Sequence, residues 1–286
     1  MLLSEQFYQT EKTGYLNEQF RLFHLKDQTR KEFSYHYHDF HKVVIFISGK
    51  AAYHIEGKAY QLKPWDILLV NRHAIHRPEI DSSVPYERFI LWIQNDIPWQ
   101  ELLKCFQKAN DRSYNLVRLN SALQEKMKDI LFELENSAKS DEYGREILIQ
   151  SLFLQFMVYL NRIFLEKQYI FDKKSYTFDS QIANILQYIN HNLKEDLSVE
   201  ALSAKYYVSK YHLMRKFKEE TGYTLHNYIV NKRLLMARTL ISNGMPVTKA
   251  AQESGFAEYS TFSRAYRKQF KTNPSEELPH YSNPLK

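Results

Sequence analysis

The same local pattern occurs twice in this sequence: a short helix, a tight corner, and a longer helix with one apolar and one polar face. In the second copy, helical spacing runs from Thr248 to Glu253, breaks at Ser254-Gly255-Phe256 and resumes from Glu258 to Phe270. Gly255 suits the corner because glycine readily adopts a left-handed backbone conformation. Two helices joined in this way form a helix-turn-helix, so the repeat constrains the fold of the whole C-terminal part.

The longer helix of this second hairpin has two distinct faces. Phe262, Tyr266 and Phe270 recur every fourth residue and form the predicted core face. The opposite face carries hydroxyl and cationic side chains, namely Tyr259, Ser260, Ser263, Arg264, Arg267 and Lys268. An aromatic inner face and a cationic outer face are typical of a recognition helix that enters the major groove of DNA.

The first hairpin lies upstream and follows the same plan. Ser198 is the predicted N-cap of a short helix, Tyr207-Val208 forms the corner, and Ser209 caps a helix from Lys210 to Glu220 that ends at Gly222. Its predicted outer face includes Lys210, Tyr211, His212, Met214, Arg215 and Lys216. A connecting helix from Leu225 to Asn243 would hold the two recognition helices at a fixed distance, which suits two successive major-groove segments.

These residues resemble the AraC/XylS family of transcription regulators. The matching positions are Arg233-Leu-x-x-Ala237, Ala251, Gly255-Phe256, Ser260-x-Phe262-x-Arg264-x-Tyr266-Arg267 and Pro274. Three positions depart from the family pattern: Lys271 replaces a usual glycine, Asn273 a Ser or Thr, and Ala250 a typical isoleucine. The resemblance implies a sequence-specific DNA-binding transcription regulator, an activator, that works as a homodimer with RNA polymerase.

The resemblance also implies how contacts to DNA are divided. Bases would be read by Tyr211, Met214 and Arg215 on the first recognition helix and by Tyr259, Ser260, Ser263 and Arg264 on the second. Phosphates would be held by Lys216, Arg267 and Lys268. Arginine can bind guanine in a bidentate manner, whereas lysine contacts to phosphate carry no sequence information.

The charge distribution favours the same part of the chain as a polyanion-binding region. The 286 residues carry a net charge of +6 and are enough for two domains. From Asp179 onward there are 15 Lys and Arg against 10 Asp and Glu, whereas the preceding residues have 24 against 23. Nearly all of the excess positive charge therefore lies in residues 179–286.

Residues 1–96 are predicted to form a small β barrel. Strand patterns occur at Val43–Ile47, Ala52–Ile55, Ile67–Val70 and Arg88–Ile93, separated by turn residues. The segment with His36-Tyr-His38, Gly49, Gly57, Pro64-x-Asp66 and His76 resembles the cupin barrel that many AraC-type regulators use to bind an effector. The expected fold is therefore a multidomain α+β chain, with a cupin-like barrel and helices followed by an all-α domain.

Helical periodicity replaces the strand pattern in residues 97–170, which we expect to be the dimerisation region. Glu146–Phe164 is apolar on almost every side and must be covered on more than one face. One face would pack on the barrel, and the other is covered either by a second subunit or by the chain itself. Residues 171–178 are the predicted linker, and 179–286 the DNA-binding domain.

The barrel contains a possible ligand site, with His36, His38 and His76 in the places of the cupin metal-binding histidines. Lys42 occupies the place of the usual glutamate, and an ammonium group repels a dication and offers no lone pair. We therefore expect no metal and no cofactor, and an organic effector bound by the histidines, Lys42, Tyr53 and Trp65. The surroundings are aromatic and contain groups that can hydrogen-bond to hydroxyls, which favours a carbohydrate as the effector. A purely structural role for His36 and His38 at a strand rim is the alternative.

Three functions remain open from the sequence: an effector-controlled DNA-binding regulator, a metal-dependent cupin enzyme with added helices, and a helical scaffold protein. The first accounts for both the hairpins and the barrel, and implies a protein that is not an enzyme. The single cysteine, Cys105, fits the cytoplasm. We also expect no secretory leader and no apolar run long enough to span a membrane.

Overall fold

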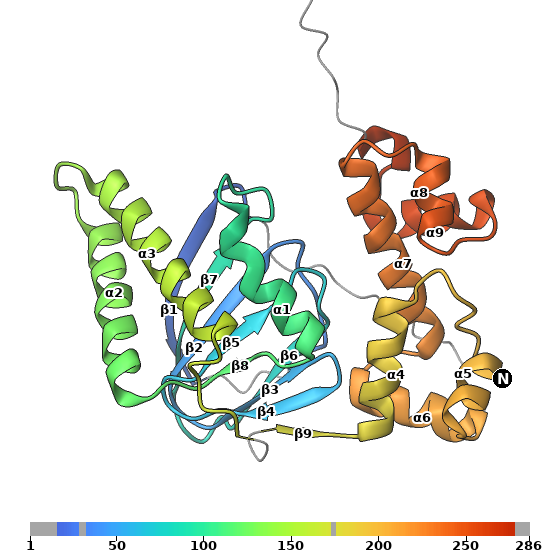
Figure 1. Ribbon diagram of the computed structural model, residues 1–286, viewed down its shortest axis with the longest axis horizontal. Coiled ribbons are helices and arrows are strands. Elements are labelled where there is room, and N and C mark those ends of the chain that lie inside the picture. Colours follow the sequence, from blue (N-terminus) through green and yellow to red (C-terminus); the bar gives the residue numbers. More distant parts are fainter. Residues whose placement is uncertain (1–15, 29–32, 173–175, 278–286) are drawn as a thin grey trace, which may run out of the picture. The chain divides into compact units, whose positions relative to one another are not determined.

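The computed structural model describes residues 16–28, 33–172 and 176–277 (Figure 1). The chain divides into two compact units, residues 1–178 and 179–286. The first unit combines two antiparallel sheets with helices, and the second is helical. The α+β multidomain fold predicted from the sequence is confirmed.

The first unit is built on a five-stranded and a four-stranded sheet. The five-stranded sheet has the order β1 (Phe20–Asp27), β7 (Tyr86–Ile93), β2 (His41–Ser48), β5 (Ile67–Val70) and β8 (Leu116–Val117). The four-stranded sheet has the order β6 (His76–Ile80), β3 (Ala51–Ile55), β4 (Lys58–Gln61) and β9 (Tyr176–Phe178). Neighbouring strands in both sheets pair antiparallel.

Strand β2 is buried on both faces, which explains its uninterrupted apolar sequence. Val44 packs with Tyr53 and Leu68 in a core cluster that both sheets share. Val43 and Ile45 point the other way, into a core formed with the helices of this unit. Side chains alternate between the two faces of a strand, so a strand covered on both sides needs apolar residues at every position.

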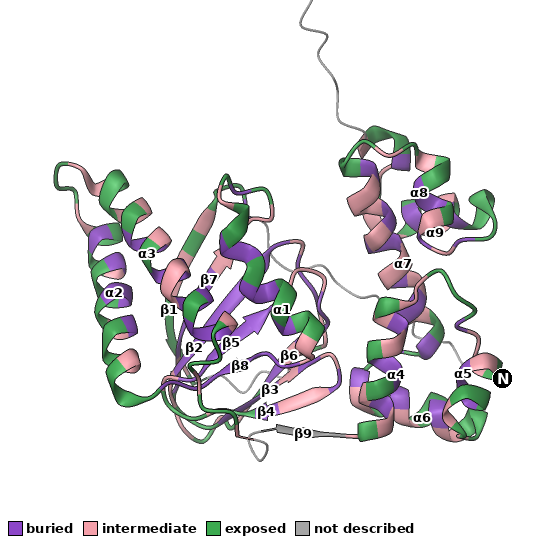
Figure 2. Ribbon diagram, in the orientation of Figure 1, coloured by how far each residue is buried: buried purple, intermediate pink, exposed green. Residues whose placement is uncertain are grey.

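Three helices cover the outer face of the five-stranded sheet: α1 (Lys104–Arg112), preceded by a 3-10 turn at Gln100–Leu103, α2 (Ser121–Lys139) and α3 (Arg145–Leu165). Figure 2 shows buried residues along the sides of α2 and α3 that meet each other and the sheet. By length and composition α3 could cross a membrane, so the prediction that the chain has no such run was wrong. Phe153, Phe156 and Leu160 of α3 are nevertheless buried in the core of the first unit.

Several elements of this unit differ from the sequence prediction. Strands β1, β4 and β6 were not predicted, and β8 and β9 extend the sheets beyond residue 96. The segment 171–178, predicted as a linker, contributes Tyr176–Phe178 as a strand paired with β4. As predicted, however, one face of α3 packs on the sheet: Phe156 lies in the same core cluster as Phe89, and Phe106 and Leu131 of the preceding helices belong to it as well.

The second unit contains both predicted helix-turn-helix hairpins. Its helices are α4 (Ser180–His191), α5 (Val199–Tyr206), α6 (Lys210–Thr221), α7 (Leu225–Ser242), α8 (Val247–Glu253) and α9 (Tyr259–Phe270). The hydroxyl groups of Ser198 and Ser209 accept hydrogen bonds from backbone N–H groups of Ala201 and His212, as expected for N-caps. Helices α5 and α6 form the first hairpin, α8 and α9 the second, and α7 connects them.

The second hairpin is anchored on α7 by the predicted aromatic residues. Phe262 and Tyr266 of α9 are fully buried against Ala250 and Ala251 of α8 and Ala237 of α7. Small side chains at these three positions allow the helices to approach closely.

Helix α9 ends at a residue in an unusual conformation. Lys271 has φ +60° and closes the helix with a hydrogen bond from its N–H to the carbonyl of Arg267. The lysine therefore takes up the left-handed conformation for which this position usually has glycine.

Candidate ligand site and nucleic-acid interface

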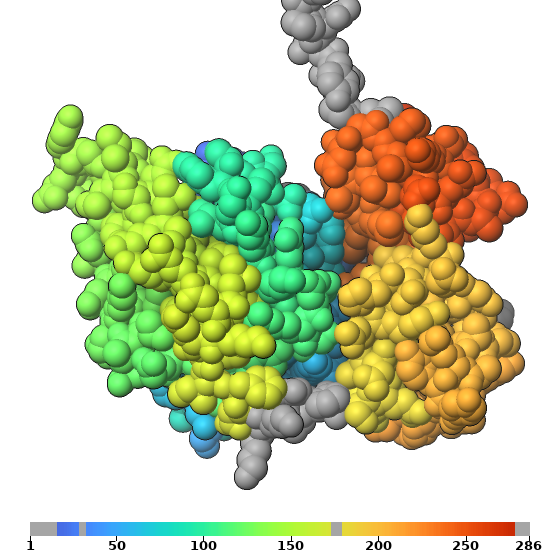
Figure 3. Space-filling view, viewed as in Figure 1, coloured from blue at the N-terminus to red at the C-terminus, as the bar shows by residue number. Residues whose placement is uncertain are grey.

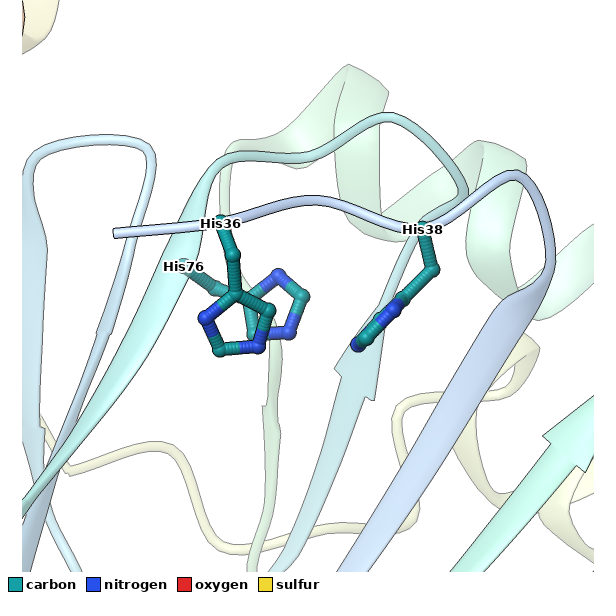
Figure 4. A group of neighbouring side chains, drawn as sticks. All are labelled: His36, His38 and His76. Atoms are coloured by element: carbon teal, nitrogen blue, oxygen red, sulfur yellow. The ribbon is translucent and has the colours of Figure 1, made fainter. Parts of the chain in front are cut away.

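The structure brings His36, His38 and His76 together (Figure 4). His36 and His76 form an isolated antiparallel bridge, in which each backbone N–H donates to the carbonyl of the other at 3.0 Å. Their ring centres lie 4.4 Å apart, and that of His38 lies 5.1 Å from His36 and 5.0 Å from His76. One ring nitrogen of each residue lies within 4.8 Å of the other two.

Two of these imidazoles are held in a defined tautomer. The Nδ1 atom of His36 lies 2.9 Å from the carbonyl oxygen of Ser34, and Nδ1 of His76 lies 2.9 Å from that of Ala74. A carbonyl only accepts, so each Nδ1 must carry the proton and donate. The lone pair of each neutral ring is therefore on Nε2.

Burial keeps the rings of His36 and His76 neutral. His76 is fully buried, and His38 is 5% exposed. Burial lowers the pKa of His36 to about 4, opposed by its bond to Ser34 and assisted by the charge of Lys42. Burial also lowers the pKa of His76 well below its ordinary value, with further repulsion from Lys42. His36 and His76 are thus uncharged imidazoles at neutral pH.

Lys42 and Tyr53 face the same interior as the histidines. The Lys42 Nζ atom lies 5.7 Å from the centre of the Tyr53 ring, which in turn stacks at 5.9 Å on His76. Burial, and secondly the charge of Arg88, lowers the pKa of Lys42 to about 7. The interior is therefore less cationic than the sequence suggested.

Trp65 lies elsewhere, although the sequence analysis grouped it with the ligand-binding residues. Its ring contacts α2, with the Lys128 Nζ atom 4.5 Å from the ring centre and Phe132 at 6.1 Å between ring centres. Two aromatic residues that the sequence analysis missed lie nearer: Phe40 stacks on His38 at 4.6 Å, and Trp92 lies 6.0 Å from His38. The register that pairs Lys42 with Trp92 across β2 and β7 brings Trp92 there, and no local sequence signal reveals it.

Buried polar atoms without hydrogen-bond partners gather in this interior. Among the described residues, the Tyr53 hydroxyl, the Trp92 indole nitrogen and the His76 Nε2 atom have no such partner. Leaving a buried polar group unsatisfied is unfavourable by about 1–3 kcal/mol. A bound ligand that satisfies these groups would remove that penalty.

The predicted recognition helices expose most of the residues assigned to DNA. On α6, Tyr211 is 74% exposed and Met214 46%, and Lys210 and Arg215 are exposed as well, whereas His212 and Lys216 are half-buried. On α9, Tyr259, Ser260, Arg264, Arg267 and Lys268 are exposed, and Ser263 is half-buried. Figure 2 shows exposed residues of α6 in green and half-buried ones in pink.

The cations of the two helices differ in their surroundings. On α6, Arg215 pairs with Glu219 at 2.7 Å, Lys216 lies 3.9 Å from the same carboxylate, and Lys210 pairs with Glu200 at 2.6 Å. On α9, Arg264 and Arg267 instead donate to backbone carbonyls one turn earlier, at 3.4 and 3.5 Å. Within the part of the chain that the structure describes, the contacts of these two guanidinium groups are therefore weak ones that DNA could replace.

Comparison with known protein families identifies both units. The AraC-like ligand binding domain matches residues 22–157, and a helix-turn-helix domain matches residues 202–278. Together with the barrel and the two hairpins, these matches define a two-domain regulator that binds a ligand and DNA. The chain belongs to the AraC/XylS family of transcription regulators.

Individual relatives are distant in sequence. The chain is 23% identical over 255 residues to the HTH-type transcriptional activator RhaS of Klebsiella pneumoniae strain 342, covering 85% of this chain and 87% of RhaS. It resembles ToxT from Vibrio cholerae O395 at 16% identity, over 90% of this chain and 96% of ToxT, with a TM-score of 0.37. A probable AraC family regulator from Rhodopseudomonas palustris CGA009 is 30% identical, over 35% of this chain and 95% of that one, with a TM-score of 0.33.

Proposed function

We propose that this regulator activates transcription when a small, oxygen-rich effector binds inside its first unit. The pairing of a polar barrel interior with two exposed recognition helices carries the proposal. The designation of the RhaS relatives as activators supports activation rather than repression. RNA polymerase is then the protein partner, and the cytoplasm, where bacterial DNA lies, is the site of action. Control of transcription by binding accounts for both units without catalysis.

The effector proposed here binds near His36, His38, Tyr53 and Lys42. Tyr53 and Trp92 offer unsatisfied donors, and the imidazoles offer lone pairs. Such groups bind hydroxyl or carboxylate oxygens, and the adjacent aromatic rings suit the apolar faces of a sugar. A carbohydrate is therefore the first class to test.

A homodimer is the proposed assembly, formed through α2 and α3. Figure 3 shows these helices at the surface of the first unit, in yellow-green. Ile147 is 73% exposed, Leu148 43% and Phe132 41%, which is unusual for apolar side chains this large. Sedimentation of the Ile147→Glu variant beside the parent tests the surface, with dissociation expected only for the variant.

DNA fragments retained by the purified full-length chain, sequenced and then titrated, test the central proposal. A shared motif should emerge, and its affinity should fall steeply as salt rises, because phosphate contacts release counterions. Adding candidate sugars should change the affinity or the transcription from a promoter that carries the motif. Retention of random sequences with equal affinity would contradict sequence-specific control.

A further inference from the structure

From the geometry of the three histidines we infer that His36, His38 and His76 bind a divalent transition metal ion, for which Zn²⁺ is the representative. The inference concerns the ligand site proposed above and assigns part of its chemistry to a metal. Three imidazole nitrogens are a known donor set for zinc with an open fourth position. Imidazole also suits nickel, copper and iron, so the class is the borderline-soft divalent cations.

The backbone places all three donors before any metal arrives. The two reciprocal hydrogen bonds between His36 and His76 fix their α-carbons opposite each other, with both rings on one side. The His38 carbonyl accepts a 2.7 Å hydrogen bond from the N–H of His73, which ties this short segment to the chain just before β6. Figure 4 shows the His38 ring turned toward the other two. Little conformational entropy remains to be lost on binding.

The hydrogen bonds at the outer nitrogens match those of metal-binding histidines. A ligating histidine usually donates its second ring N–H to a carbonyl or carboxylate, which fixes the tautomer and makes the free nitrogen a better donor. His36 and His76 both do so through Nδ1, to Ser34 and Ala74. The Nε2 atom of His76 is buried and has no hydrogen-bond partner among the described residues. This lone pair is thus available inside the cluster.

The distances require only a small adjustment. Tetrahedral zinc with bonds of about 2.0–2.1 Å places its nitrogens about 3.3–3.4 Å apart. The three donor atoms already lie within 4.8 Å of one another, so modest rotation of the rings would close the site. The open fourth position would take water or an oxygen of the effector, so the metal and the effector would share one site.

Lys42 is the residue that argued against a metal from the sequence. In the structure its ammonium nitrogen lies 5.7 Å from the centre of the Tyr53 ring. The three histidines are sufficient donors without the missing carboxylate. When Lys42 is protonated, its charge favours an anionic oxygen as the fourth ligand, which would balance the charge of the ion.

Zinc titration of the full-length protein, purified without a histidine tag and freed of metal by a chelator, tests the inference. We expect one Zn²⁺ per chain by calorimetry and a rise in melting temperature with zinc concentration. His36→Ala and His76→Phe should each weaken zinc binding by at least about tenfold. Changing a residue that merely orients a metal ligand already weakens binding by about 10- to 100-fold, so removal of a ligand should cost no less. His54→Ala is the matched control, because His54 pairs with Glu79 at 2.8 Å and lies outside the cluster.

His36 is only half-buried, so its variant keeps the test decisive if His76→Phe fails to fold. The absorption spectrum of bound Co²⁺ gives an independent readout, and both substitutions should abolish its four-coordinate bands. No saturable binding, or one zinc per chain that survives both substitutions, would overturn the inference. The zinc titration does not involve DNA. A chain that binds its DNA motif but no zinc would therefore contradict the metal site and leave the proposed regulatory function standing.

Discussion

Gly255 lies directly against the carbonyl oxygen of Leu193, so closely that a Cβ atom at position 255 would clash with it. The same Cβ would lie 2.8 Å from the Nε atom of Arg233. Arg233 in turn donates from Nε to the Leu193 carbonyl at 2.8 Å and from its terminal nitrogen to the Glu195 carbonyl at 2.9 Å. The corner of the second hairpin, the connecting helix and the loop before the first hairpin therefore meet at one point.

Gly255→Ala should destabilise the second unit by about 2–4 kcal/mol, because backbone strain at φ +88° adds to the clash with Leu193. Urea unfolding followed by far-ultraviolet circular dichroism measures the change. Gly144→Ala is the matched control: Gly144 also has a positive φ, +77°, but a Cβ there meets nothing within 4 Å. The control should lose about 1 kcal/mol. Equal losses would mean that the contact with Leu193 has no energetic role.

Arg264→Ala and Lys268→Ala should weaken DNA binding in different ways. Loss of a bidentate contact from Arg264 to guanine would remove about 1–3 kcal/mol for the preferred sequence and relax the preference at one base. Loss of Lys268 should weaken every sequence alike and lower the salt dependence by about one unit. Fluorescence anisotropy with the selected motif and its single-base variants distinguishes the two.

Lys205→Ala serves as the control for both variants. The Lys205 Nζ atom lies 4.3 Å from the centre of the Tyr188 ring on α4, so this cation is occupied away from the recognition helices. Its removal should leave both affinity and specificity close to the parent values. Uniform losses for Arg264→Ala and Lys268→Ala would show that the division into base and phosphate contacts is wrong.

Glu219→Gln should strengthen DNA binding about two- to fivefold at low salt, as expected for exposed charges. The Glu219 carboxylate pairs with Arg215 and lies near Lys216, and it would also repel phosphates. Glu253→Gln is the matched control, because Glu253 pairs with Lys194 outside both recognition helices. Titrations at two salt concentrations should show the gain shrinking as salt rises. Unchanged affinity would imply that breaking the ion pair between Arg215 and Glu219 costs no free energy when DNA binds.

Predictions from the sequence were most accurate for elements whose local residue pattern coincides with their burial in the fold. The caps at Ser198 and Ser209 and the aromatic anchors Phe262 and Tyr266 are local signals, and the structure contains them. Strand β1 was missed because its burial does not alternate regularly, and its place at the edge of the sheet is set by pairing with β7, some sixty residues later in the chain.

Side-chain positions at the ligand site were less predictable than the strands that carry them. His36 and His76 meet because a β-bridge aligns them, with His38 two residues further along, and the resemblance to the cupin barrel made this grouping predictable. Trp65 was misplaced because its left-handed backbone, φ +68°, turns the ring onto α2. Trp92 entered the site through cross-strand register, which a single sequence does not specify.

Arg118→Leu should destabilise the first unit by about 3–5 kcal/mol, because it would leave the buried carboxylate of Asp66 uncompensated. Arg118 donates to both oxygens of Asp66, at 2.8 and 2.6 Å, and Asp66 is 1% exposed. Urea unfolding monitored by tryptophan fluorescence reports on this unit, since all three tryptophans precede residue 100. Replacing Asp66 by leucine as well should recover part of the loss. If the double variant lost as much free energy of unfolding as the two single variants together, this coupling would be contradicted.

The stability of the first unit should decrease as the pH falls below 6.5, in part because of His41. Burial, and secondly the charge of Arg72, lowers the pKa of His41 to about 3, opposed by its bond to Asn95. The unfolded chain, with a histidine pKa of about 6.5, therefore binds more protons than the folded chain between these two values, and protonation favours unfolding. His41 alone contributes a loss of up to about 1.4 kcal/mol per pH unit within that window.

His41→Gln isolates this contribution from those of other titrating groups. In the parent, Nδ1 of His41 accepts from the backbone N–H of Arg72 at 3.3 Å, and Nε2 donates to Asn95 Oδ1 at 3.4 Å. Glutamine can both accept and donate but does not titrate. Urea unfolding at pH 7.5, 6.5 and 5.5, followed by tryptophan fluorescence, should therefore show a shallower decline for the variant, by about 1 kcal/mol or more between the last two values. Parallel declines in parent and variant would show that His41 is protonated as readily in the folded chain as in the unfolded one.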